Sequence, residues 1–506
     1  MPNNILDYTK ENRGRVLLLF LLFLLAIYEF VTAGFNSFAI ICLLPCVIIY
    51  IYVIFRWKMF TFWTLIFVNY FLQMKNVSEN LPIPMSLADE MLELILIAIA
   101  IIDARHDSHF YRALNLMMLA ITIWGGLCFI EVFNDTCNLG IDIGAWFNGF
   151  RLMAIQLVWI LLVFSVYVSN PKVLMTYIKL WALFSLFSAI WTYKQIYIGM
   201  TDTEKLWMET RGRSTHILQA GTLIRYFSTF SDAANYGCHA AAAAAAFIIF
   251  GVTNRFKRAK LFFLLVAAAV IWGMFQSGTR TAIFCLGAGL VVYIFLSKSV
   301  KIAVPFSIIF GFFAFILIFT TIGQGNQQIR RMRSAFDKND ASANVRDINK
   351  EAMKKYLRDA PWGIGIGMAG NVPANNKYAK LSTIPPDSEY VNIWKLTGTI
   401  GVSVFACCNI LIFLGGCIIV LFRLNNKTLI GIGAGFCSAF VAINLGGYAN
   451  QVLYQYPNGL TFYGGMAIVY ILPYLEPEWE EYEQKRIAQN EEKKRLKLEK
   501  KMASRV

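Results

Sequence analysis

The sequence is poor in charged residues, in histidine and in the motifs of soluble enzymes. Asp, Glu, Lys and Arg make up 15% of its 506 residues, and only 4 residues are histidine. No HExxH, GxSxG or P-loop sequence occurs, so zinc proteolysis, serine hydrolysis and ATP-driven transport have no support within this chain. A single GxGxxG match, at Gly365, Gly367 and Gly370, follows a predicted helix and lacks a βαβ context. We therefore exclude dinucleotide binding.

Cysteine occurs without the spacing that metal sites need. None of the 10 cysteines belongs to a CxxC or Cys/His ligand pattern. Nearly all of them, such as Cys42, Cys285, Cys407 and Cys408, lie inside apolar segments, and only Cys137 falls in a polar connection. The sequence predicts neither disulfides nor structural zinc.

Long apolar segments dominate the chain instead. Hydrophobic residues make up 57% of it, and the mean hydropathy is +0.54. Segments approaching the ~20 apolar residues that cross a bilayer recur along nearly the whole length. We predict an all-α polytopic membrane protein with about fourteen transmembrane helices, or twelve or thirteen because the third segment is short. The expected spans are residues 16–34, 37–55, 59–74, 87–102, 113–131, 151–169, 174–198, 235–252, 260–276, 280–297, 302–322, 389–421, 429–447 and 459–475.

Basic residues in alternate connections predict the orientation. If the N-terminus is cytoplasmic, every inner turn is basic, as the positive-inside rule requires. The C-terminus is then cytoplasmic too, and the net charge of +15 faces anionic membrane lipids instead of nucleic acid. The basic residues of these turns are Arg56, Lys58, Arg105, Arg112, Lys172, Arg255, Lys257, Arg258, Lys260, Lys298, Lys301, Arg423 and Lys427.

These features divide the chain into six parts. We expect an N-terminal transmembrane bundle, a basic outer loop, a central group of transmembrane helices, a large outer loop, C-terminal transmembrane helices and a charged cytoplasmic tail. Their boundaries are 1–198, 199–234, 235–322, 323–388, 389–475 and 476–506.

The two outer loops are long and basic, although outer loops normally are not. The first contains Arg211, Arg213, His216 and Arg225, and the second contains Arg346 among several arginines. Within the second loop, apolar residues recur at helical spacing and predict an amphipathic helix over 344–358. Basic charge on this side of the membrane calls for a functional explanation.

Three helix starts at the outer face carry capping residues. These are Ser231 with Asp232, Ser277 to Thr279, and Asp387 with Ser388. Because helix N-termini expose unpaired N–H groups, several of them beside Arg225 and Arg280 would bind phosphate or pyrophosphate. The alternative is that these two arginines only anchor span ends among lipid headgroups.

Five motifs taken together resemble the O-antigen ligase and polymerase superfamily. They are Arg225-Tyr-Phe-Ser-Thr-Phe-Ser-Asp-Ala-Ala-Asn-Tyr-Gly, Gln276-Ser-Gly-Thr-Arg-Thr-Ala, Asp359-Ala-Pro-Trp-Gly-Ile-Gly-Ile-Gly in the loop with Arg346, Asp387-Ser-Glu-Tyr, and Leu396-Thr-Gly-Thr-Ile-Gly. The resemblance covers roughly residues 205–447; the earlier spans agree only in hydropathy.

That resemblance implies a membrane glycosyltransferase of the bacterial inner membrane, with its active site facing the periplasm. The implied donor is an undecaprenyl-pyrophosphate-linked glycan, and Arg225, Arg280 and Arg346 are implied to contact its pyrophosphate. Where ligases of the family show His-Asn, this chain has Asp387-Ser388. Asp387 is then either the general base or only a helix cap, and the substitution favours a polymerase over a lipid A-core ligase. His216 is a second candidate base, or an ordinary surface histidine.

We expect metal-independent, inverting transfer with no cofactor, because cationic side chains and helix dipoles can stabilise a pyrophosphate leaving group. The expected acceptor is a glycolipid, either a second lipid-linked repeat unit or lipid A-core. A chain-length regulator is left open as a further partner. The rival interpretation is a flippase or transporter of the same lipid-linked oligosaccharides, but no internal repeat favours it.

Overall fold

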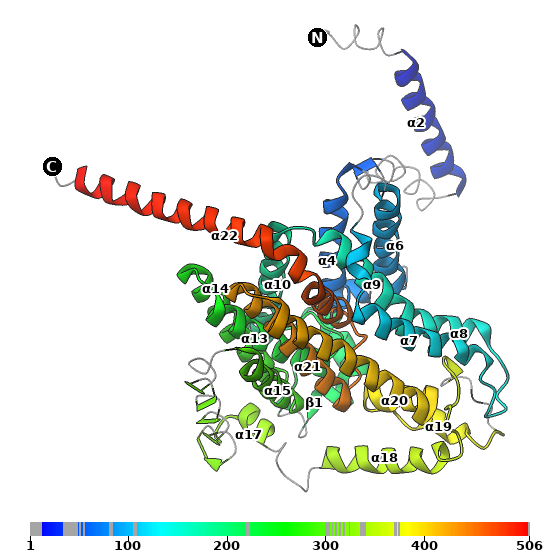
Figure 1. Cartoon of the computed structure of the whole chain (residues 1–506). Helices are drawn as coiled ribbons and strands as arrows, with labels where there is room; N and C mark the ends of the chain where they lie inside the picture. The colour runs from blue at the N-terminus through cyan, green and yellow to red at the C-terminus, as the bar shows by residue number, and fades with distance from the viewer. Residues whose placement is uncertain are drawn as a thin grey trace. The chain divides into compact units, whose positions relative to one another are not determined.

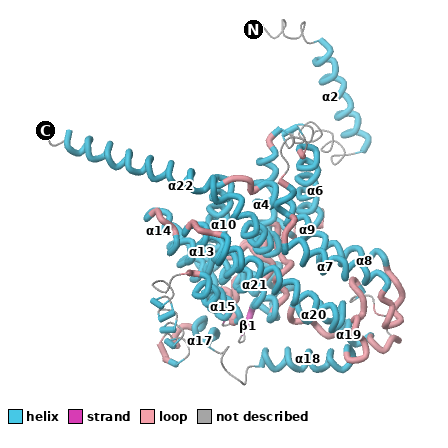
Figure 2. The backbone as a smooth tube through the Cα atoms, viewed as in Figure 1, coloured by secondary structure: helices cyan, strands magenta, loops and turns pink. Residues whose placement is uncertain are grey.

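The computed structural model is almost entirely helical (Figures 1 and 2). It describes residues 13–33, 49, 52–53, 56–79, 84–104, 109–218, 223–298, 304–305, 307–308, 311–312, 315–316, 319–322, 324–333, 341–368, 372 and 375–503. The α-helices are α2 (Arg13–Ala33), α4 (Lys58–Phe71), α5 (Lys75–Ser78), α6 (Met85–Asp103), α7 (Leu116–Ile130), α8 (Ile143–Phe150), α9 (Gln156–Tyr167), α10 (Pro171–Tyr197), α11 (Asp202–Trp207), α12 (Arg213–His216), α13 (Ala233–Thr253), α14 (Lys257–Gln276), α15 (Thr281–Leu296), α17 (Gln327–Arg333), α18 (Ala341–Leu357), α19 (Ala379–Thr383), α20 (Glu389–Ile418), α21 (Lys427–Ala449) and α22 (Gly464–Ala503).

Short 3-10 and π segments extend several of these helices, and one small sheet is present. The segments are η1 (Phe110–Ala113), η2 (Glu131–Phe133), η3 (Arg151–Ile155), η4 (Met208–Gly212), η8 (Ile419–Arg423) and η9 (Gly459–Tyr463). Strands β1 (Ile217–Leu218) and β2 (Leu223–Ile224) pair antiparallel, with Ile217 opposite Ile224.

The chain separates into two units, Met1–Thr64 and Leu65–Val506. The first contains the apolar helix α2 and the start of α4. The second contains all the other helices, and every site discussed below lies within it.

Seven of the described helices are long and apolar enough to cross a membrane. They agree with the spans expected at 113–131, 151–169, 174–198, 235–252, 260–276, 389–421 and 429–447, and the spans expected at 87–102 and 280–297 are also helical, as α6 and α15. The span expected at 37–55 falls largely outside the described residues, and the span expected at 302–322 falls partly outside them. The helical, multi-pass architecture is confirmed, and the count of fourteen stays a prediction.

Helices α13 and α21 form the centre of the second unit. All seven alanines from Ala240 to Ala246 are at most 1% exposed, because small side chains let neighbouring helices approach closely. Gly289 of α15 shows how close: a Cβ there would lie 3.0 Å from both Ala245 Cβ and the Ser438 carbonyl oxygen. The alanine run is therefore a packing surface, as its composition predicts.

Two peripheral helices test the loop and tail predictions. The amphipathic helix expected over 344–358 is α18, whose bounds are Ala341–Leu357. The charged tail begins inside α22, which continues without a break across residue 475. Its first part is not simply solvated: Trp479 and Glu483 are buried, and Glu483 accepts a 2.7 Å hydrogen bond from the Thr428 hydroxyl at the start of α21.

Candidate active site

Side chains cap two of the three helix starts that the sequence singles out. Asp232 accepts hydrogen bonds from the N–H groups of Ala234 and Asn235 at the start of α13, at 2.8 and 3.0 Å. Ser388, and not Asp387, caps α20 by accepting from the N–H of Val391 at 3.2 Å. The prediction of a side-chain cap at α15 is wrong, because the hydroxyls of Ser277 and Thr279 are engaged elsewhere.

The turn that precedes α15 is tied to Arg225. The guanidinium donates from Nε to the Ser277 carbonyl at 3.2 Å, and from Nη2 to the Thr279 hydroxyl at 3.0 Å. The same hydroxyl donates to the carbonyl of Ala233, the first residue of α13, at 2.6 Å. Two motifs about fifty residues apart in sequence are therefore in direct contact. Arg225 holds the residues that directly precede Arg280 in place by hydrogen bonds.

A further arginine reaches this turn from the large loop. Arg331 of α17 donates from Nε to the carbonyl of Gly278 at 2.7 Å. Arg280, half-buried, directly precedes α15. The contacts from Arg225 and Arg331 to this turn are to neutral carbonyls and a hydroxyl. Charge of one sign thus gathers at the start of a helix, where the helix dipole is also positive.

The connection between α21 and η9, residues 450–458, joins all three helix starts. Asn450 donates to the Thr281 hydroxyl in α15 at 3.4 Å, and its carbonyl accepts from the N–H of Glu389 in α20 at 3.3 Å. The Tyr456 carbonyl accepts from the side chain of Asn235 in α13 at 3.0 Å. We call the end of the bundle where α13, α15 and α20 begin the site face.

The carboxylates of Asp387 and Glu389 differ in their surroundings. Glu389 is buried, and its carboxylate accepts from the backbone N–H groups of Leu453 and Tyr454. Asp387 is half-buried and accepts from the side chain of Asn349 in α18 at 2.9 Å. Glu389 therefore holds the 450–458 connection in place, whereas Asp387 lies under the helix of the large loop.

His216 is buried and not on the surface, so its interpretation as a surface histidine is wrong. It is 2% exposed, and its Nε2 accepts from the N–H of Ala233 at 3.0 Å. Its Nδ1, which carries the proton in this tautomer, lies 3.2 Å from the Gly212 carbonyl. Burial, and then the charge of Arg225, lower the pKa of His216 from 6.5 to about 4. Because Nε2 already accepts a hydrogen bond from the first residue of α13, this geometry suits a positioning residue better than a general base.

Three further arginines belong to the predicted site. Arg211 is exposed and pairs with Glu79 at 3.2 Å, and Arg213 is exposed as well. The side chain of Arg346, on α18, lies outside what the structure describes.

Sequence reasoning missed Lys75 of α5. Its Nζ donates to the Ser231 carbonyl at 2.6 Å and stands 3.8 Å from the centre of the Trp207 ring. Burial lowers the pKa of Lys75 from 10.5 to about 8, although Asp232 and Glu79 act against this. A lysine directly after an apolar span gave no signal, since such residues usually face headgroups. The 450–458 connection was also missed, although its dense Asn, Gln and Tyr content was visible.

The glycine-rich loop after Asp359 has a structural role. Gly365 donates from its N–H to the Leu396 carbonyl at 2.9 Å, and the N–H of Ile400 donates to the Pro361 carbonyl at 3.3 Å. The backbone of Gly398 is left-handed, with φ 65°, and a Cβ there would lie 2.0 Å from the Pro361 carbonyl oxygen. These two motifs together form the joint between the large loop and a kink in α20.

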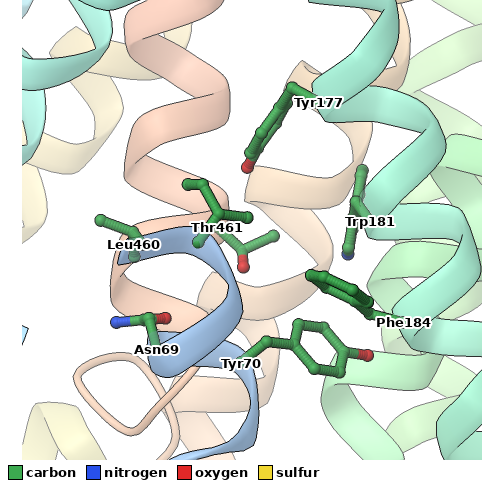
Figure 3. A pocket seen from close by; sticks show the side chains of 8 residues that line it. Asn69, Tyr70, Tyr177, Trp181, Phe184, Leu460 and Thr461 are labelled. Atoms are coloured by element: carbon green, nitrogen blue, oxygen red, sulfur yellow. The ribbon is translucent and has the colours of Figure 1, made fainter. Parts of the chain in front are cut away.

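Two other polar features involve helices outside the site face. On α6, the buried Asp89, Glu90 and Glu93 lie together, and Glu90 pairs with Arg151. Asp89 accepts from Asn69 at 2.9 Å. Asn69 also lines a small cavity walled by Tyr70, Tyr177, Trp181, Phe184, Leu460 and Thr461, shown in Figure 3, which has room for about one water molecule. Within the described residues, no group of three or more acidic, His or Cys side chains could hold a metal ion.

The fold and the site face define a multi-pass membrane protein in which arginines gather at converging helix starts. Residues 265–406 match the family model of O-antigen ligases, which confirms the resemblance to the O-antigen ligase and polymerase superfamily. This part of the chain is therefore similar to membrane enzymes of the O-antigen ligase type. The matched range includes the 277–280 turn, α17, α18 and the start of α20. A search of curated proteins found no match.

Proposed function

We propose that the protein transfers a glycan from undecaprenyl pyrophosphate to a sugar hydroxyl at the periplasmic face of the bacterial inner membrane. The observation that carries this proposal is the turn before α15, where Arg225 and Arg331 bind neutral groups beside Arg280. Their charge and the helix dipole favour a pyrophosphate there. The proposal includes fourteen spans, cytoplasmic termini and the large loop 323–388 in the periplasm.

The chemistry follows from these charges. The acceptor hydroxyl attacks C1 of the donor sugar as the C1–O bond to phosphate breaks, which inverts the configuration at C1. Asp387 accepts the hydroxyl proton. Undecaprenyl pyrophosphate leaves with the bonding electrons, and Arg280 with the α15 N-terminus stabilises its charge. Since fixed cations do this work, we propose that the transfer needs no metal.

We further propose a polymerase, with a second lipid-linked repeat unit as acceptor. Support comes from Asp387, which stands where ligases of the family show histidine. Capping falls to the neighbouring Ser388, so the position of Asp387 is not explained by capping. A lipid A-core acceptor would instead make the protein a ligase, and the two acceptors are compared directly in the experiment below.

The test uses purified protein in liposomes with an undecaprenyl-pyrophosphate glycan and each acceptor in turn. Release of undecaprenyl pyrophosphate and glycan transfer are measured for wild type, Arg280→Ala and the control Arg258→Ala, an exposed arginine at the start of α14. We expect Arg280→Ala to lose at least about a hundredfold in kcat, and the control to retain activity. If wild type releases no undecaprenyl pyrophosphate with either acceptor, the proposed function is wrong.

A further inference from the structure

A groove between α20 and α21 reaches the site face. It is open on one side and has a volume of about 340 Å³, and its walls are mainly apolar and aromatic. Figure 1 shows α20 and α21 running side by side over this length. The lining residues are Tyr390, Ala406, Asn409, Ile410, Phe413, Phe440, Val441, Asn444, Leu445 and Tyr448.

Tyr390 and the two asparagines that line the groove already have partners in the protein. The Asn444 carbonyl oxygen accepts from the Tyr390 hydroxyl at 3.0 Å, and its amide donates to the Phe440 carbonyl at 2.8 Å. Asn409 accepts from the Tyr463 hydroxyl at 2.8 Å. A ligand in the groove therefore gains little from polar groups of its own, and a hydrocarbon chain fits this lining best.

One end of the groove meets the candidate active site. Tyr390 directly follows Glu389, and Tyr448 lies two residues before Asn450, which joins the starts of α15 and α20. Lys350 of α18 places its Nζ 6.0 Å from the centre of the Tyr448 ring. The apolar groove thus ends beside the cation of Lys350 and close to the start of α15, which is complementary to a molecule with an anionic head and a long apolar tail.

We propose that this groove holds the hydrocarbon chain of the lipid-linked donor, with the pyrophosphate head at the starts of α15 and α20. This inference rests on the proposed function. The groove would bind the donor along its hydrocarbon chain. The enzyme would then select its donor partly by the length of the polyprenyl chain. Bulk phospholipid filling the groove is the competing outcome.

Binding is tested without turnover by a polyprenyl diphosphate that carries a benzophenone on its chain. We expect photo-crosslinks to peptides containing Ala406, Ile410 or Val441, and we expect unlabelled polyprenyl diphosphate to suppress them. Excess phospholipid should not suppress them. Crosslinks confined to other helices, or equal suppression by phospholipid, would overturn the proposal whether or not the protein is a transferase.

Kinetics supply a second test with matched variants. Ala406→Phe fills the groove, whereas Cys407→Phe places the same ring on the adjacent exposed position of α20, outside the groove. With a long-chain donor we expect Ala406→Phe to raise KM roughly tenfold or more, and with a donor of two isoprene units we expect no change. Cys407→Phe should leave both unchanged. Equal losses with both donors, or no loss with either, would refute the groove, while a wild type inactive with both donors would refute the transferase itself.

Discussion

Asp387 and Ser388 are adjacent, and the structure gives them separable tasks that a pair of variants can test. Asp387→Asn preserves size and leaves an oxygen that can accept the 2.9 Å hydrogen bond from Asn349. Contact between α18 and the start of α20 is therefore retained, and the free energy of unfolding should change by less than about 0.5 kcal/mol. An amide cannot take the acceptor proton, so kcat should fall about 10²- to 10⁴-fold.

Ser388→Ala has the opposite profile. It removes the oxygen that accepts from the Val391 N–H at 3.2 Å, and loss of such a cap costs about 1 kcal/mol. Turnover should fall by less than about tenfold, since no proton transfer depends on this hydroxyl. Both variants are compared with wild type by kcat in liposomes and by thermal unfolding in detergent. Near-normal turnover of Asp387→Asn, or equal loss of turnover in both variants, would refute the assignment of the base.

Three further outcomes follow from buried charges. The lowered pKa of His216 means that the fold favours the neutral imidazole. The contribution of His216 to the free energy of unfolding is therefore fully present above pH 6.5, and up to about 3 kcal/mol is lost as pH falls through 4. His216→Asn should reduce the fall in unfolding temperature at acidic pH, measured as unfolding temperature against pH. Lys75, with a pKa of about 8, loses its proton and its charged contact to Ser231 above that pH, so activity should decline there. Lys75→Arg should remove the decline. If the dependence of activity on pH is the same in Lys75→Arg as in wild type, Lys75 is not its cause. Arg151→Met leaves Glu90 buried without its cation and should cost about 3–5 kcal/mol, measured by unfolding in detergent, with recovery in the double variant Arg151→Met with Glu90→Gln.

Several elements of the fold could be predicted from the sequence because they depend on local pattern. Apolar length places the spans, and helical spacing places α18 within three residues of its observed start. Asp232 was recognised as a capping residue because the preference of carboxylates for helix starts is local chemistry. The cap predicted at α15 failed for the complementary reason: whether the Thr279 hydroxyl turns to its own helix or to the Ala233 carbonyl depends on α13, a segment far away in sequence.

The sequence by itself determined that this is a multi-pass membrane protein with arginines beside polar helix starts, since hydropathy and charge are properties of the individual residues. Only the tertiary structure decided which of those groups meet. Arg225 joins the 277–279 turn, His216 serves the start of α13, and Lys75 reaches Ser231. Each contact is a hydrogen bond between segments that are separate in the sequence, and hydrogen bonds require separations near 3 Å that no linear pattern specifies.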